Sequence, residues 1–353
     1  MTTDSQSTVE GAADESSQPL YIVGLCSRGR PTLLERLLRS LDRQKGVAAR
    51  RVEIVIIDNN PSPTIVAERM AAIAGFPVHV AHQPKTGLVH ARNMLFDEVE
   101  ARGAEWMIGI DDDEWVATDW LAQWIRASEE IPADIMVGKV AILHQEGGSL
   151  LSTYRQYRDP IAGEPATLLG TCNYAVNQRI FSKASGLGMR FDHHFNDIGG
   201  EDAEFMLRAK RKYDVIPFGW PHSHAFEERS GPRAKLGYML KRTMQDRINT
   251  LMISRMHRKM GLMTGRKPFF FVLLRRTNKS LVFMLGHAVA GIALLPFQPR
   301  RAGRYVGRAL EHFVQFIAVV PFYYGWRRRS YVDAVTDHYI HDLKESPQNN
   351  DSV

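Results

Sequence analysis

Four short apolar runs between residues 20 and 143 restrict the fold more than any other feature of this sequence. Each has the length of a strand, and the longest stretches within them are continuously apolar, as in strands that are buried on both faces of a sheet. The runs are LYIVGLC (20–26), VEIVIID (52–58), FPVHVAH (76–82) and WMIGI (106–110).

Helical patterns separate these strands. Pro31 precedes TLLERLLRSL, in which leucines recur at helical spacing, and proline is favoured in the first turn of a helix. Further helices are predicted through 67–73 and over 90–103. Alternating strands and helices predict an α/β fold, in which helices cover both faces of a mostly parallel sheet. Ligands of such sheets bind at the carboxyl ends of the strands.

The middle of the chain is less regular, and both ends are polar. Strands are predicted near 135–143 and 171–176, and a helix is predicted over 201–211. Residues 1–19 and 343–353 are predicted to be disordered tails, because they lack the apolar residues of a core. The first 19 residues contain four acids and no Lys or Arg, which does not fit a signal peptide.

Charge and cysteine content narrow the functional classes. The net charge is +6, but residues 229–308 hold 18 Lys or Arg against one acid, so this segment carries +17 and the remainder −11. A segment this basic requires an anionic partner, which is nucleic acid, anionic lipid or a phosphorylated substrate. No motif of interleaved aromatic and basic residues favours nucleic acid. The two cysteines, Cys26 and Cys172, form no CxxC pair, which favours a reducing compartment.

Three consecutive acids, Asp111, Asp112 and Asp113, directly follow the predicted strand at 106–110. Adjacent carboxylates repel one another, and a hard cation such as Mg²⁺ or Mn²⁺ would neutralise them and bridge to a substrate diphosphate. Asp111 and Asp113 lie on the same side if this segment is extended. An acidic turn after a strand also occurs without function, but the apolar strand before this run favours a site.

A second acidic pair, Glu201-Asp202, opens the helix predicted over 201–211. A helix N-terminus favours an ionised carboxylate, which makes Asp202 a candidate general base. The alternative is ordinary capping of the helix. Asp58 ends the second predicted strand, where it either binds a nucleoside or forms an Asx turn before Pro61.

Basic residues near the predicted strand ends supply further candidates. Arg92 lies in the first turns of the helix over 90–103, where it either pairs with a diphosphate or stays solvated. His222 and His224 occupy alternate positions. One of them is a candidate metal ligand, and the alternative is a structural role for both.

In this order and spacing, the motifs resemble those of family 2 glycosyltransferases, and in particular those of bacterial exopolysaccharide glucosyltransferases of the succinoglycan type. The resemblance covers residues 20–230 and implies the GT-A fold, with its Rossmann-like, mostly parallel sheet. Each motif is weak singly, and together they are specific. The matching segments are VGLCSRGRPTLLERLLRSL, VEIVIIDNN, GLVHARN, WMIGIDDDEW and FDHHFNDIGGEDAEFMLR.

The resemblance also implies a role for each matching residue. Asp202 is the catalytic base, with Glu201 beside it. Asp113 binds the divalent cation, Mg²⁺ or Mn²⁺. The residue pattern itself, and not the resemblance, makes Asp111 and His224 further candidate ligands. The residues expected to contact the nucleotide-sugar are Ser27, Arg30, Asp58, Arg92, Asp111 and Asp112, with Asp58 on the nucleoside and Arg92 near the diphosphate. Where the family often has a Thr and a further polar residue, this sequence has Cys26-Ser27. This departure bears most on the contact expected between Ser27 and the nucleotide.

The implied reaction is the transfer of a single sugar with inversion. Asp202 takes the proton of the acceptor hydroxyl, and the metal stabilises the departing nucleoside diphosphate. The QxxRW motif of processive synthases is absent, since residues 245–247 read Gln-Asp-Arg. The expected donor is a UDP-hexose, and the expected acceptor is a glycan or a polyprenyl-diphosphate-linked glycan in cell-surface polysaccharide synthesis.

Residues 231–342 are predicted to form a basic helical region with two apolar segments, 281–297 and 312–326. Neither segment reaches the ~20 apolar residues of a comfortable span. If both spanned, their basic linker would lie outside, against the positive-inside tendency. We therefore expect an interfacial or re-entrant hairpin at an anionic membrane surface, on the cytoplasmic face of a bacterial inner membrane. The alternative is a pair of soluble core helices.

Two other functions remain open at the level of sequence. A soluble sugar nucleotidylyltransferase shares the nucleotide-binding domain, but it normally has a Gly-rich basic loop after the first strand, of which SRGRP is a faint version. A non-catalytic, membrane-associated glycan-binding protein would not need both acidic groups.

Overall fold

The computed structural model describes residues 18–144, 159–166, 170–229, 235–263 and 269–324. The predicted tail over 343–353, and residues 1–17 of the predicted tail over 1–19, lie outside these ranges.

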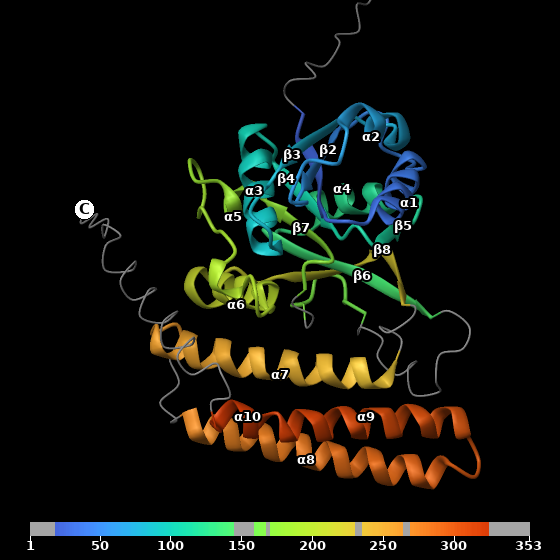
Figure 1. Ribbon diagram of the computed structural model, residues 1–353, viewed down its shortest axis with the longest axis vertical. Helices are drawn as coiled ribbons and strands as arrows, with labels where there is room; N and C mark the ends of the chain where they lie inside the picture. Colours follow the sequence, from blue (N-terminus) through green and yellow to red (C-terminus); the bar gives the residue numbers. More distant parts are fainter. Residues whose placement is uncertain (1–17, 145–158, 167–169, 230–234, 264–268, 325–353) are drawn as a thin grey trace, which may run out of the picture.

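The described residues form one eight-stranded sheet with the order β3-β2-β1-β4-β7-β6-β8-β5 (Figure 1). Its first four strands coincide with the four apolar runs and are mutually parallel. The strands are β1 (Leu20–Ser27), β2 (Arg51–Asp58), β3 (Val78–His82), β4 (Trp106–Ile110), β5 (Glu114–Val116), β6 (Ile135–His144), β7 (Asn173–Asn177) and β8 (Phe218–Arg229).

The other half of the sheet is mixed. β7 runs antiparallel to both β4 and β6, β8 runs parallel to β6, and β5 runs antiparallel to β8. The α/β class is confirmed. In the described sheet β6 and β8 run in the same direction as β1 to β4, and only β5 and β7 run against it. An antiparallel strand needs no helical crossover, so the regular strand–helix alternation that indicates parallel pairing ends after β4.

Helices cover both faces of the sheet, as predicted. One face packs against α1 (Pro31–Asp42), α2 (Ala67–Ala74) and α4 (Trp120–Glu130). The other packs against α3 (Leu88–Ala101), α5 (Gln178–Phe181) and α6 (Glu201–Tyr213). A short 3-10 helix, η3, spans His193–Phe195.

The strand register brings the candidate residues together. β1 pairs with β2 so that Ser27 lies opposite Asp58, and it pairs with β4 so that Gly24 lies opposite Gly109. The carboxyl ends of β1 and β4 therefore meet at one edge of the sheet, where Ser27 and the acids at 111–113 follow. This is the edge at which α/β sheets bind ligands.

The C-terminal helices form a layer of their own. α7 (Leu236–Lys259) lies between the sheet domain and a hairpin of α8 (Phe269–Leu294) and α9 (Pro299–Ile317), and α10 (Val319–Tyr324) follows (Figure 1). Most of the apolar segment 281–297 lies in α8. The segment 312–326 is divided between α9 and α10, and residues 325–326 lie outside the described ranges. Among the described helices, none has both the length and the apolar character needed to cross a bilayer.

Candidate active site

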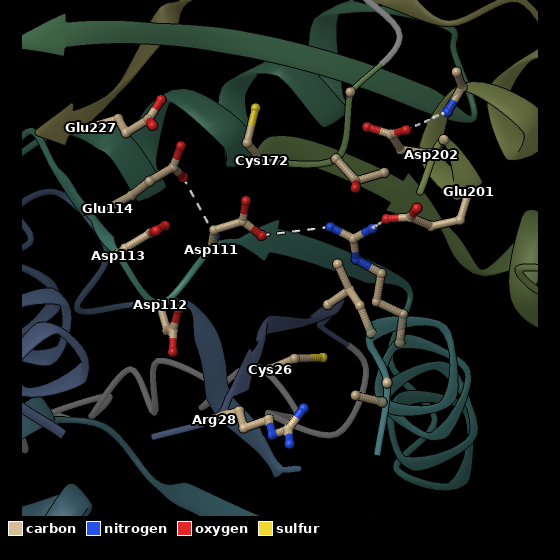
Figure 2. A pocket seen from close by; sticks show the side chains of 18 of the residues that line it. Cys26, Arg28, Asp111, Asp112, Asp113, Glu114, Cys172, Glu201, Asp202 and Glu227 are labelled. Atoms are coloured by element: carbon tan, nitrogen blue, oxygen red, sulfur yellow. Dashed lines mark hydrogen bonds and ion pairs between the residues drawn. The ribbon is translucent and has the colours of Figure 1, made fainter. Parts of the chain in front are cut away.

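A pocket of about 660 Å³ opens where the carboxyl ends of β1 and β4 face the start of α6 (Figure 2). Its floor is formed by the ends of the two strands and by the start of α3. Its walls are formed by residues 170–172, the first residues of α6 and one side of α7. Of the residues predicted from sequence, the pocket is lined by Ser27, Arg30, Arg92, Asp111, Asp112, Asp113, Glu201 and Asp202.

The three acids after β4 contact two different arginines, Arg30 and Arg92. Asp112 is buried and accepts hydrogen bonds from Ser27 Oγ at 2.8 Å and from Arg30 Nη1 at 2.9 Å. The same Arg30 nitrogen donates to Asp113 Oδ2 at 2.9 Å. Asp111 instead faces Arg92, with Asp111 Oδ1 3.6 Å from Nη2.

The expectation that Asp111 and Asp113 share one side rested on an extended segment, and the segment is not extended, but both residues line the pocket. Residues 112–113 form a turn, and the amide of Glu114 donates to the carbonyl of Asp111. A turn breaks the alternation of side chains that holds along a strand. Figure 2 shows the carboxylates of Asp111 and Asp112 pointing away from each other. Asp113 lies near enough to Asp111 to raise its pKa.

Arg92 joins the two acidic groups of the pocket. Its side chain is buried, and its guanidinium donates to Glu201 Oε1 at 2.8 Å on one side while it faces Asp111 on the other (Figure 2). The solvated alternative for Arg92 is therefore excluded. Its contact with a donor diphosphate stays a prediction.

The Glu201-Asp202 pair begins α6 at the edge of the pocket. Gly200, with φ of 93°, precedes it in a backbone conformation that L side chains rarely adopt. Neither carboxylate caps the helix as an N-cap side chain, because the N-cap residue is Gly200. Burial, and then the carboxylate of Glu201, raise the pKa of Asp202 to about 6, although Arg92 and the amide of Ala203 oppose this rise. The helix N-terminus therefore does not dominate, but Asp202 still ionises near neutral pH.

Negative charge is concentrated around Asp111. Burial raises the pKa of Asp111 to about 7, and Asp113 and Asp112 add to the rise while Arg92 opposes it. Burial and Asp111 also raise the pKa of Glu114 well above its usual range. Glu114 lies opposite Glu227 in the β5–β8 ladder, and both side chains line the pocket.

Sequence reasoning missed Glu114 and Glu227. Glu114 directly extends the acidic run, so its position was a signal. Glu227 lies 113 positions further along the chain and reaches the pocket only through strand pairing. No local pattern marks it.

Asp58 forms a turn with the residues that follow it, which is the alternative to nucleoside binding. Both of its carboxylate oxygens accept backbone hydrogen bonds, from Asn60 at 3.0 Å, Thr64 at 2.6 Å and Ile65 at 2.9 Å. Burial would raise the pKa of Asp58, but these hydrogen bonds hold it below its usual range. The pocket is lined at this point by Asn59. Nucleoside binding by Asp58 stays a prediction.

The histidines predicted as candidate metal ligands do not line the pocket. His224 and Glu227 are three residues apart on β8, where the pairing with β6 continues without a shift from Lys139 onward. Side chains three positions apart point to opposite faces of a strand, so His224 lies on the face away from Glu227. In the part of the chain that the structure describes, no three His, Cys, Asp or Glu side chains are arranged to hold a metal ion.

α7 supplies a wall of the pocket that the predicted domain boundary at 230 had separated from it. Tyr238, Met239, Arg242, Asn249 and Thr250 are among its lining residues. The buried Asn249 amide donates to the carbonyl of Gly199 at 2.9 Å. The C-terminal helical region therefore contributes directly to the site.

Comparisons with known proteins give one family match and one similar sequence. Residues 22–183 match the family described as glycosyl transferase family 2. The succinoglycan biosynthesis protein ExoM of Rhizobium meliloti (strain 1021) is 27% identical over 237 residues, which cover 64% of this chain and 72% of that protein.

Solved structures with a detectable likeness have lower sequence identity. The S. aureus protein TarS 1-349, in complex with UDP-GlcNAc, is 13% identical with a TM-score of 0.46 over 66% of each chain. The mannosyltransferase PcManGT from Pyrobaculum calidifontis, in complex with GDP-Man and Mn²⁺, is 14% identical with a TM-score of 0.49 over 90% of each chain. The chain therefore has a glycosyl transferase family 2 match over residues 22–183 and is similar in sequence to ExoM beyond it.

Proposed function

We propose that this enzyme transfers a single sugar, with inversion, from a nucleotide-sugar to a glycan or a polyprenyl-diphosphate-linked glycan in exopolysaccharide synthesis. The observation that carries the proposal is the pairing of two acidic groups across one pocket, with Arg92 between them. One group ends the parallel strands, where nucleotides bind. The other presents a base from the opposite wall. The similarity to ExoM supports the polysaccharide context.

Asp202 is the proposed base. It lines the pocket, and its pKa of about 6 leaves it largely ionised at neutral pH, yet basic enough to accept a proton from an acceptor hydroxyl. Attack by that hydroxyl on the anomeric carbon displaces the nucleoside diphosphate in one step, and a single displacement inverts the configuration.

The donor is proposed to lie along the β1 and β4 ends, with its diphosphate toward Arg30 and Arg92. A UDP-hexose is the donor that the motifs favour. Arg30 already contacts Asp112 and Asp113, and Arg92 contacts Asp111. Both cations are therefore held at the acids that the donor must approach.

A divalent cation fits the charge of this pocket. Eight carboxyl side chains line it against four arginines, a formal surplus of four negative charges. An anionic diphosphate requires that this surplus be neutralised, and carboxylate oxygens are the ligands that Mg²⁺ and Mn²⁺ prefer. Asp111 and Asp113 are the residues proposed to hold the ion. When bound, the ion would stabilise the charge of the departing diphosphate.

The acceptor is proposed to enter along α7, because that wall faces the base. Arg242 lies near enough to Asp202 to lower its pKa, and Tyr238 offers an exposed ring of the kind that packs against sugars. A phosphate on the acceptor would meet the positive charge of Arg242.

A donor panel tests the proposal. The purified chain is incubated with UDP- and GDP-hexoses, Mn²⁺ or Mg²⁺ and a lipid-diphosphate acceptor, and nucleoside diphosphate release and product configuration are measured. We expect metal-dependent release of the nucleoside diphosphate and an inverted product. The Asp202→Asn variant should lose about 10²- to 10⁴-fold in rate while still binding the donor in calorimetry. Release of pyrophosphate from a nucleoside triphosphate would instead establish a nucleotidylyltransferase, and turnover by Asp202→Asn at the wild-type rate would refute the base.

A further inference from the structure

α8 is apolar on two opposite sides, and among the described residues only one of these sides is covered. The covered side packs against α9 so closely that a β-carbon at Gly291 would lie 3.0 Å from Cγ2 of Val306. The opposite side carries a stripe that we name the α8 outer face, formed by Val282, Leu285, Val289 and Ile292. These four side chains are 54% to 71% exposed. Their spacing of three, four and three residues places them on one line along the helix.

The α8 outer face is a contiguous apolar patch, whereas an ordinary protein surface has apolar residues scattered singly. It continues beyond the end of α8 into Leu295 and Phe297, which is 80% exposed. A helix that is apolar on all sides is normally buried, and a contiguous exposed apolar patch marks an interaction surface. Within the described ranges, no other element covers this stripe, and α8 is the outermost helix of the molecule (Figure 1).

Charge identifies the partner. Residues 269–324 contain seven Lys or Arg and a single acid, Glu311. Arg275 and Lys279 are exposed on the turns of α8 before Val282, and Arg301, Arg304 and Arg308 are exposed along one side of α9. A second copy docked on the same stripe would bring two basic hairpins together. An anionic lipid surface offers both the apolar layer and the opposite charge.

We propose that the α8 outer face docks in the headgroup region of an anionic bilayer, with α8 lying in the plane of the membrane. The apolar stripe enters the boundary of the acyl chains, and the basic residues of α8 and α9 bind lipid phosphates. This surface lies outside the pocket, so the proposal goes beyond the transfer reaction.

Docking in this way would place the pocket close to lipid-linked substrates. α7 lies between the α8–α9 hairpin and the sheet domain, and its other side lines the pocket (Figure 1). Two layers of helices at interaxial distances of 8–10 Å would hold the pocket on the order of 20 Å from the headgroups. A diphosphate-linked acceptor that stays anchored in the bilayer can span that distance through its glycan.

The test uses flotation of the full chain with vesicles of phosphatidylcholine mixed with phosphatidylglycerol, and with vesicles of phosphatidylcholine alone. We expect the chain to float with the anionic vesicles and to be largely released by salt. The variant Val282→Asn/Val289→Asn/Ile292→Asn should bind about tenfold or more weakly, because three apolar side chains no longer enter the bilayer. The matched control is Val66→Asn, which changes an exposed valine outside the helical layer and should bind as the wild type does.

Two further measurements separate the possible results. Arg301→Gln/Arg304→Gln/Arg308→Gln should lose the preference for anionic vesicles and keep its cooperative thermal unfolding. With a soluble acceptor, the rate at which the α8 variant transfers sugar and releases nucleoside diphosphate should stay within about twofold of the wild-type rate. Failure of docking and failure of the proposed transfer are therefore distinguishable. Flotation of the α8 variant at the wild-type level would overturn the proposal. So would a wild-type dimer that fails to float and that the α8 variant dissociates, because the stripe would then join two copies.

Discussion

Arg92 is the side chain on which both acidic groups of the pocket depend. It is buried, it lies within 2.8 Å of Glu201 and 3.6 Å of Asp111, and its charge lowers the pKa of both Asp111 and Asp202. Without this cation, burial would raise the pKa of both carboxylates further. A residue that a sequence alone leaves open as a solvated helix arginine is therefore the electrostatic centre of the site.

Replacement of Arg92 by methionine tests that role, because methionine keeps most of the volume and removes the charge. We expect the pKa of Asp202 to rise above 6, the rate at neutral pH to fall on the order of 100-fold, and stability to fall by about 3 kcal/mol because a buried ion pair loses one partner. Urea unfolding and a pH–rate profile measure the two effects. Arg92→Lys, which keeps the charge, should retain more of both, and equal losses in the two variants would contradict an electrostatic role.

The pH dependence of the reaction follows from Asp202. Because the base must be ionised, kcat/KM should fall as the pH drops below the pKa of about 6. The carboxylate of Glu201 raises that pKa, so Glu201→Gln should move the acid limb of the profile to lower pH. The same change leaves Arg92 with one fewer partner, which shifts the limb in the same direction. A limb that stays in place or moves upward in Glu201→Gln would show that a different group titrates.

At the scale of elements, α7 controls the position of the base through α6. Near the start of α6, the Asn249 amide donates to the carbonyl of Gly199 at 2.9 Å. Further along, the fully buried His257 hydrogen bonds to Glu204 through Nε2 at 3.1 Å. The two helices are thus joined on either side of the turn that carries Glu201 and Asp202, and we regard Asn249 as a positioning residue.

Asn249→Ala removes the contact nearest the base. We expect kcat to fall about tenfold or more, because misplacement of a catalytic group by a fraction of an ångström is costly, while the dissociation constant of the donor is unchanged. Asn249→Asp cannot donate to the Gly199 carbonyl and should not restore the rate, whereas Asn249→Gln should restore part of it. Lys241→Ala is the control on the same helix, since Lys241 is exposed and does not line the pocket. A purely structural role would lower stability in Asn249→Ala and leave kcat intact.

The elements differ in how far their sequence predicts them. β1 and β4 and the helices α1 to α3 lie within about two residues of their predicted positions, because their apolar patterns are local and long enough to be specific. β5 was not predicted, because a strand of three residues directly after an acidic turn is too short to show an apolar pattern. The antiparallel insertion of β7 between β4 and β6 depends on pairings between distant segments, which local periodicity does not encode.

The same distinction applies to the site. Ser27, Arg30, Arg92 and the two acidic groups line the pocket because each follows a strand or opens a helix, and such positions can be read locally. Glu227 and the wall from α7 were missed because they arrive from strand pairing and from the packing of a separate helical layer. His224 does not line the pocket, because side chains alternate along β8 and His224 faces away from Glu227. Which side chains of β8 face the pocket depends on its pairing with the partner strands.

At the scale of the whole molecule, residues 229–308 carry a net charge of +17 and the rest of the chain −11, while the pocket has a surplus of carboxylates. The basic segment contributes Arg242 to the pocket lining, and Asp246 from the same helix offsets it. The long-range attraction of the basic layer draws anionic substrates toward the protein. Close to the acids, however, the local field opposes a diphosphate, so donor binding needs a counter-ion.

Thermal unfolding measures this requirement for a counter-ion without any turnover. UDP-hexose and Mn²⁺ together, each at about 100 times its dissociation constant, should stabilise the chain by about 2.7 kcal/mol, which raises Tm by roughly 5 °C. Either component alone should give a smaller shift, and EDTA should abolish the joint one. Because the pKa of Asp111 is about 7, protons compete with the ion below that pH, so the joint shift should grow between pH 6 and pH 8. Asp111→Asn should remove most of this pH dependence. A full shift with the nucleotide-sugar in EDTA would mean that the arginines neutralise the pocket unaided, and the proposed metal requirement would then be wrong.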